Sequence, residues 1–594
     1  MSTFFYCYVS FSLLAAVHTF VVSVGVPIIQ TKYGEIHGQL VTVNYEGKNV
    51  EIRKFLGIPY AKAPVGDRRF RKPEMMNALP VTPFMATNFG PICPQPNVAM
   101  FGLTTSEDCL FLNIYAPMMS SSTVLKPVMV YIHGGGFDLG FSDIYDGSII
   151  GAYADVIVVA MNYRIGPLGF LSTKDAEAPG NFGLWDQRLA IEWVSENIAA
   201  FGGDRSKITI FGESAGGSSV IYQTVYPGND GLFQRAIAQS GTIAAWGVNR
   251  FDSNYKVSTA FAKYAGCNYV SSSLLLQCLR NKSSDHMKTV TESFQSFLPV
   301  NLVNNTWVPV FDGVFVVTKQ DHLLNEMADP LVNSKFPSFK NVDLMIGANK
   351  LDGNVFITNF LEYINESSYG PLTDYFNVTS EQFEHIIMPI AAAVSLGEIP
   401  NKAVLEAIRF EYTAWDDRNN LTRRLQNLIN IATDLSLNAP SVSTARAHAN
   451  GNTSTFMYQF STAYVMEFLP IPPMLKDEES AGHADELGFV FGFPAALLLP
   501  FGANPANVTA EQHKVSKATM AMWSNFAKTG NPNKPINLEA IYSNLHWPQF
   551  TTMAEQYLEI TPNMGSHSAK TRLAAKAAQF WNDLVPSLQT LGSH

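Results

Sequence analysis

A serine flanked by glycines is the residue of this chain whose setting best suits covalent chemistry. Residues 212–216 read G-E-S-A-G, a form of the pattern G-x-S-x-G. A β-branched run at residues 207–211 precedes the pattern, and residues 217–222 are typical of the start of a helix. A strand, this pattern and a helix predict a sharp turn that exposes the hydroxyl of Ser214 as a nucleophile. Glycine is needed on both sides because it removes the Cβ clashes of such a turn.

The pattern alone also occurs by chance in long chains, and a glycine-rich segment upstream supplies the context that it needs. Residues 127–132 are typical of a buried strand and lead directly into H-G-G-G-F at residues 133–137. Such a loop holds backbone N–H groups that can bind a developing oxyanion. We expect Gly135, Gly136 and Ala215 to supply the donors. A plain glycine-rich turn is the alternative, but the order of the motifs favours the catalytic interpretation.

Further motifs follow one another along the chain. They are F-L-G-I-P-Y-A at 55–61, V-G-D-R-R-F at 65–70, S-E-D-C-L-F-L-N-I at 106–114, N-Y-R-I-G at 162–166, G-N-F-G-L-W-D-Q-R at 180–188 and Q-S-G-T at 239–242. With them the chain resembles the type-B carboxylesterase and cholinesterase family of α/β-hydrolases over nearly its whole length. The resemblance implies an α/β-hydrolase fold, with a mostly parallel central sheet flanked by helices, and acyl transfer by a Ser–acid–His triad.

The general base is expected downstream of Ser214, because chain order in this fold is nucleophile, acid, histidine. A serine hydroxyl is a poor nucleophile unless a histidine takes its proton. His483 is the candidate, since residues 481–492 follow a Pro-rich segment and resemble the family's histidine loop. The other downstream histidines are interpreted as structural or exposed: His286, His322, His385, His448, His513, His546, His567 and His594.

The acid position departs from the family pattern. Residues 342–353 fit the family's frame of a strand followed by G-x-x-x-x-E-G, with Asp352 where glutamate is usual. Aspartate orients the histidine in other serine hydrolases, but it is one methylene shorter, so the loop or the histidine must shift by about an ångström. The alternative is that Asp352 only caps a turn before Gly353. Asp343 and Asp312 are interpreted as structural.

Other polar residues are expected to support the fold. The resemblance implies two ion pairs, Arg69–Glu107 and Arg164–Asp186, and a buried Ser240 behind the nucleophile. Glu213 is expected to add negative field near Ser214, with its side chain pointing away from the proton that is transferred.

Alternating strands and helices must position these groups. Residues 156–160 are a buried-strand run, and residues 182–200 have the apolar spacing of a helix that ends before Gly202. The alternation predicts an α/β fold with a mostly parallel sheet between helices.

The region from about residue 365 to 450 is expected to form helices near the mouth of the pocket. Residues 365–450 lack a clear strand pattern, and residues 421–435 have helical spacing. The last helix is expected over residues 569–584, with Phe580 and Trp581 packed inward.

Composition bounds the classes of function. The 594 residues are 47% hydrophobic and 15% charged, which suits one large globular domain over residues 26–594. The net charge of −10 without a basic stripe argues against nucleic-acid binding. No His/Cys cluster indicates a metal site, so we predict neither a metal nor a cofactor. The predicted partner is a small-molecule ester substrate.

The N-terminus and the cysteines indicate secretion. Residues 4–22 are mostly apolar and S-V-G at 23–25 suits cleavage, so residues 1–25 are predicted to be a signal peptide, with an uncleaved anchor as the alternative. No stable membrane span is expected. Outside this segment lie Cys93, Cys109, Cys267 and Cys278, which allow several pairings. Short spacing favours Cys93–Cys109 and Cys267–Cys278, and the resemblance implies the same pairs.

Asparagines in N-x-S/T sequons are candidate glycosylation sites of a secreted protein. They are Asn281, Asn304, Asn365, Asn377, Asn420, Asn452 and Asn507. We expect some of them to carry glycans.

The function predicted from these patterns is that of a secreted serine carboxylesterase with the triad Ser214, Asp352 and His483. A cholinesterase is one alternative, but residues 94–108 lack the Trp that binds a quaternary ammonium in such enzymes, and Phe101 replaces it only in part. A non-catalytic adhesion protein of the neuroligin type is the other alternative, but such proteins usually lose the nucleophile that this chain keeps.

Overall fold

The computed structural model describes most of the chain. The described residues are 25–96, 103–118, 124–243, 253–294, 307–318, 327, 335–356, 379–389, 391–392, 400–463, 475, 480–498 and 504–591. The predicted signal segment, Phe101 and the sequons at Asn304, Asn365 and Asn377 lie outside the described residues, apart from Gly25 at the end of that segment.

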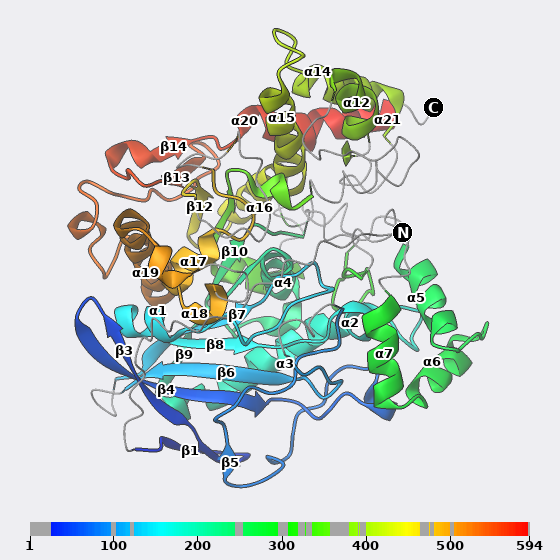
Figure 1. Ribbon diagram of the computed structural model, residues 1–594, viewed down its shortest axis with the longest axis vertical. Helices are drawn as coiled ribbons and strands as arrows, with labels where there is room; N and C mark the ends of the chain where they lie inside the picture. The colour runs from blue at the N-terminus through cyan, green and yellow to red at the C-terminus, as the bar shows by residue number, and fades with distance from the viewer. Residues whose placement is uncertain are drawn as a thin grey trace, which may run out of the picture.

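A large mixed sheet forms the centre of the molecule (Figure 1). Its order is β14-β13-β12-β11-β10-β9-β7-β8-β6-β4-β3. The strands are β3 (Gln39–Tyr45), β4 (Lys48–Pro59), β6 (Phe111–Pro117), β7 (Lys126–Ile132), β8 (Ile157–Met161), β9 (Gly203–Glu213), β10 (Arg235–Gln239), β11 (Asp343–Asn349), β12 (Thr455–Phe460), β13 (Gln556–Ile560) and β14 (Ala569–Thr571). Neighbours from β8 to β13 pair in parallel, and the outer pairs are antiparallel. The predicted α/β fold is confirmed.

Helices cover both faces of this sheet, which explains why its central strands are apolar on both sides. On one face Val128 and Val130 of β7 belong to a core cluster with α3 (Phe182–Asn197) and α4 (Ala215–Val225). On the other, Met129 and Tyr131 pack with α1 (Ser148–Ala154), α17 (Glu486–Phe491) and α19 (Ala510–Thr529). The predicted helix near residue 182 is confirmed as α3, which a 3-10 turn extends to Gly202 at φ 89°.

Helices from distant parts of the sequence gather at one end of the molecule (Figure 1). They are α12 (Ser380–Gln382), α14 (Lys402–Tyr412), α15 (Leu421–Thr433), α20 (Ala575–Gln579) and α21 (Val585–Leu591). The prediction of a helix near residues 421–435 is confirmed, and Asn420 caps α15 by accepting a hydrogen bond from Arg423 N. Phe580 and Trp581 are buried in this cluster, as expected.

The start of the last helix was predicted too early. Residues 569–571 form β14, which pairs antiparallel with β13 and completes the edge of the sheet. Arg572 and Ala574 then adopt φ of 59° and 46°, and α20 begins at Ala575. The strand pairing offered by β13 therefore overrides the helical composition of this segment.

Buried charges and disulfides tie the segments around the sheet together. Arg69 binds Glu107 through contacts of 2.5 and 2.6 Å, and Arg164 binds Asp186 at 2.7 Å. The expected ion pairs are therefore present. The disulfides are Cys93–Cys109 and Cys267–Cys278.

Surface features of the described residues bear on secretion. Asn281, Asn452 and Asn507 are exposed, and Asn420 is half-buried. Within the described part of the chain, no helix has the length and apolar character needed to cross a membrane.

Candidate active site

Ser214 stands in a strained turn between β9 and α4. Its φ of 59° and ψ of −123° are rarely adopted by a residue with a side chain. The strain persists because the backbone around it is tightly packed. A Cβ atom on Gly216 would lie 2.0 Å from Ile132 O, and one on Gly212 would lie 2.6 Å from the same oxygen. The glycines therefore permit the turn by close approach of neighbouring strands, as the pattern predicted.

The glycine-rich loop after β7 lies against this turn, because β7 and β9 are neighbours in the sheet. A Cβ atom on Gly134 would come within 3.0 Å of Ser214 Cβ. Gly135 and Gly136 have φ of 104° and 66°, values that favour glycine. Within the described residues, the amides of Gly135, Gly136 and Ala215 donate no hydrogen bond to a protein acceptor. These N–H groups remain available for a ligand.

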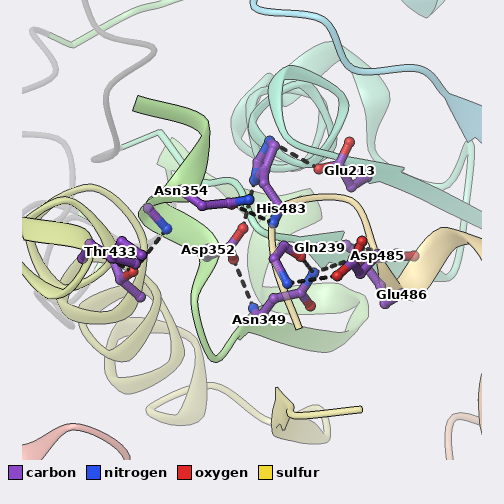
Figure 2. A network of polar contacts seen from close by, with 12 residues as sticks. Glu213, Gln239, Asn349, Asp352, Asn354, Thr433, His483, Asp485 and Glu486 are labelled. Carbon is purple, nitrogen blue, oxygen red and sulfur yellow. Dashed lines mark hydrogen bonds and ion pairs between the residues drawn. The ribbon is translucent and has the colours of Figure 1, made fainter. Parts of the chain in front are cut away.

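The segment after β11 carries Asp352, and the loop before α17 carries His483. Asp352 Oδ1 lies 2.6 Å from His483 Nδ1, although 131 positions separate the residues in sequence (Figure 2). Asp352 Oδ2 accepts a hydrogen bond of 2.8 Å from Asn349 N. Both side chains are buried. The shorter acid thus reaches the imidazole, and it does more than cap a turn.

Glu213 points toward the histidine, contrary to the expectation from sequence. Its Oε1 lies 3.1 Å from His483 Nε2, the nitrogen that would receive a proton from Ser214 (Figure 2). The reason is steric, since a Cβ atom on Gly134 would lie 2.9 Å from Glu213 Oε2, so the glycine-rich loop closes the other side. Among the described contacts, none joins Ser214 Oγ to His483 as a hydrogen bond.

The electrostatics of this contact favour a charged imidazole. Burial by itself lowers the pKa of His483, but the negative charges of Glu213 and Asp352 outweigh burial and raise the pKa to about 9. Burial raises the pKa of Glu213 to about 8, against the opposing effect of His483. The two carboxylates therefore stabilise the imidazolium form of His483 in this arrangement.

A buried polar network lies beneath the histidine loop, and sequence reasoning did not find it. Glu486 accepts hydrogen bonds from Gln239 Nε2 at 2.9 Å and from Asn349 Nδ2 at 2.6 Å. Gln239 in turn accepts from Trp523 Nε1 at 2.9 Å, which joins the network to α19. Burial raises the pKa of Glu486. The available signal was the acidic pair Asp485-Glu486, which begins two residues after His483.

The remaining predicted positions are structural in the described chain. Asp312 Oδ1 accepts from the amides of residues 314–316, which makes a turn. Asp343 lies 3.5 Å from Arg235 at the start of β11. Ser240 is fully buried with φ of 47°, and its amide donates to Gly347 O. No group of His, Cys, Asp or Glu among the described residues is arranged to hold a metal ion.

Comparison with known proteins defines the class to which this fold and site belong. A model of the carboxylesterase family matches residues 25–581, and the chain therefore belongs to that family. It is 34% identical to neuroligin-2 of Mus musculus, over 95% of this chain and 68% of that protein. Neuroligin-3 of Mus musculus is 33% identical over 95% of this chain and 70% of its own length. Bile salt-activated lipase of Bos taurus is 34% identical over 95% of this chain and 89% of its own length.

Proposed function

We propose that this protein is a secreted serine carboxylesterase that hydrolyses small carboxylic esters. The observation that carries the proposal is the buried contact of 2.6 Å between Asp352 and His483 beside the strained turn at Ser214. A serine, a histidine and an orienting carboxylate within one site are the groups that acyl transfer requires. The match to bile salt-activated lipase is consistent with an ester substrate.

In the proposed reaction Ser214 Oγ attacks the acyl carbon while His483 Nε2 takes the hydroxyl proton. Asp352 holds the Nδ1–H of the imidazole and stabilises the imidazolium that forms. The amides of Gly135, Gly136 and Ala215 bind the oxyanion of the tetrahedral intermediate. His483 returns the proton to the leaving alcohol, which leaves the acyl group on Ser214. Water then attacks the acyl carbon while His483 takes a proton from it. His483 returns this proton to Ser214 Oγ as the acid leaves. Because Nε2 contacts Glu213 in this structure, the imidazole must exchange that contact for Ser214 before proton transfer.

The second candidate is a non-catalytic adhesion protein of the neuroligin type. The identity of 34% to neuroligin-2 equals that to bile salt-activated lipase. The contact of His483 Nε2 with Glu213 also fits a site that is not assembled for turnover. The retained Ser214 and the His483–Asp352 contact support the esterase instead.

Hydrolysis of a short p-nitrophenyl ester separates the two candidates. We expect the purified protein to turn over the ester, Ser214→Ala to lose about 10⁶-fold in kcat, and Asp352→Asn roughly 10⁴-fold. Ser219→Ala is the matched control, because Ser219 is a buried hydroxyl of α4 that accepts from Gln187 instead. A folded wild-type protein that neither hydrolyses the ester nor reacts with an organophosphate would overturn the proposal and favour adhesion.

The disulfides fit an extracellular protein. We further propose that residues 1–25 are a cleaved signal peptide and that residues 26–594 fold as one domain. The continuous sheet supports the second part, because its strands extend from Gln39 to Thr571.

A further inference from the structure

Two loops meet at the histidine through their backbones as well as through its ring. The acid loop, defined as residues 349–354, follows β11, and the histidine loop, defined as residues 480–485, precedes α17. Leu351 N donates to Ala481 O at 2.8 Å. Asn349 Nδ2 donates to Gly482 O at 2.6 Å. The two loops are thus held together independently of the Asp352–His483 contact.

Asn354 adds a contact that acts on His483 itself. Its Oδ1 accepts a hydrogen bond of 2.8 Å from His483 N, and the residue is 1% exposed (Figure 2). A Cβ atom on Gly482 would lie 2.7 Å from Asn354 Nδ2, so the histidine loop lies directly against the asparagine. One short 3-10 turn, Asp352–Phe356, therefore holds both the ring and the backbone of the same histidine.

We propose that Asn354 is a positioning residue that sets the distance between the two loops for an aspartate acid. The proposal rests on the proposed esterase function. Aspartate is one methylene shorter than the glutamate usual in the family, so the histidine backbone must lie about an ångström closer to the acid loop. The hydrogen bond from His483 N to Asn354 Oδ1 keeps the histidine backbone at this shorter distance, while Asp352 binds Nδ1. The geometry is matched to aspartate and poorly suited to glutamate.

The test is the interaction between substitutions at the two positions. Asn354→Ala is expected to lower kcat about 10- to 100-fold with little change in KM, because the imidazole is misplaced while the substrate pocket is not. Asp352→Glu in the otherwise native chain is expected to lower kcat as well, because the longer side chain crowds a histidine that is held close. The double variant Asp352→Glu/Asn354→Ala is expected to have a higher kcat than Asp352→Glu alone. Without the Asn354 contact, the histidine can move away from the longer acid.

A purely structural asparagine predicts a different pattern, in which the two losses multiply. Losses that multiply would overturn the proposal. Asn354→Asp keeps an acceptor for His483 N but adds negative charge. It is expected to retain more kcat than Asn354→Ala and to move the acidic limb of the pH profile to higher pH. Equal losses for both variants with an unchanged profile contradict the proposal.

Proton NMR of the buried His483–Asp352 hydrogen bond provides a readout that does not depend on turnover. The downfield imidazole resonance is expected to shift or broaden in Asn354→Ala. It is expected to remain in Asn525→Ala, the matched control, because Asn525 is also buried and binds the backbone of Pro532 and Ile536 away from the site. If wild type is inert toward esters, the esterase proposal fails while this resonance still tests the positioning role. An unchanged resonance in folded Asn354→Ala overturns the positioning role.

Discussion

At the scale of single residues, the carboxylates of Glu213 and Asp352 together raise the pKa of His483 against the effect of burial. The carboxylate of Glu213 lies 3.1 Å from His483 Nε2, and the pKa of His483 is raised to about 9. Because a general base must be neutral, the activity of the wild type is expected to rise with pH through an alkaline range. Glu213→Gln removes a negative charge that stabilises the imidazolium, so the pKa of His483 should fall. The acidic limb of the profile of kcat/KM against pH should then move to lower pH.

The matched control for this prediction is Glu74→Gln, because Glu74 is an exposed carboxylate paired with Lys62. It is expected to leave the pH profile in place. A Glu213→Gln profile that coincides with wild type would show that Glu213 carries no charge next to the working histidine.

At the scale of elements, the neighbouring strands β7, β9 and β10 hold the turn at Ser214. Gly241 follows β10, and a Cβ atom there would lie 2.1 Å from Ser214 O and 2.7 Å from Ser218 N. Gly241→Ala must therefore push the turn away from β10 and displace Ser214 from the amides that we propose to bind the oxyanion. We expect a loss of about 10²-fold in kcat/KM toward a short ester, because catalysis depends on sub-ångström placement.

Gly565→Ala is the control for this substitution. Gly565 has extended backbone at φ 177°, and its nearest neighbour to a Cβ atom is the flexible His567 ring at 3.4 Å. The activity and thermal stability of the Gly565→Ala variant are expected to match those of the wild type. Full activity of Gly241→Ala would mean that the turn tolerates displacement and that close packing does not position the nucleophile.

At the scale of the whole molecule, buried ion pairs join segments that no single element connects. Arg69 binds Glu107, and its Nη1 donates to Leu279 O at 2.6 Å, so it links the first disulfide loop to the end of α6 (Ser272–Arg280). Glu107→Gln leaves the guanidinium buried without its partner. We expect a loss of about 3–5 kcal/mol in the free energy of unfolding, measured by chemical denaturation.

The control is the exposed pair Arg423–Asp416 on the surface, whose contact measures 2.6 Å. Asp416→Asn is expected to cause no measurable change in stability, because solvent screens exposed pairs. Equal effects of the two substitutions would show that burial does not determine the strength of these pairs.

Secretion is also a property of the whole chain. We expect the protein recovered from the medium of a eukaryotic host to begin at Val26 and to lose mass on treatment with an N-glycosidase. Substitution of the exposed Asn281, Asn452 and Asn507 by Gln should remove part of that shift. A protein that stays with the membrane fraction and retains residues 1–25 would favour an uncleaved anchor.

Local patterns were sufficient to predict the central strands, the helix near residue 182 and the turn at Ser214. The glycines at 212 and 216 permit the turn at Ser214, and β-branched runs predict the central strands, because both depend on neighbours in sequence. The start of the last helix was missed at residues 569–571, where pairing with β13 is a long-range interaction. The resemblance to the family pointed to Asp352 and His483, but not to the distance between them.

Only the tertiary structure decided how the site is arranged. The order of β9, β10 and β11 brings Ser214, Ser240 and Asp352 to one edge of the sheet, and the loop contacts bring His483 to them. The contact of Glu213 with His483 and the hydrogen bond of Asn354 with His483 N join residues that are 129 or more positions apart in sequence. The direction of a buried side chain is set by the atoms that pack around it. Those atoms come from residues that are distant in sequence, so local sequence patterns do not predict it.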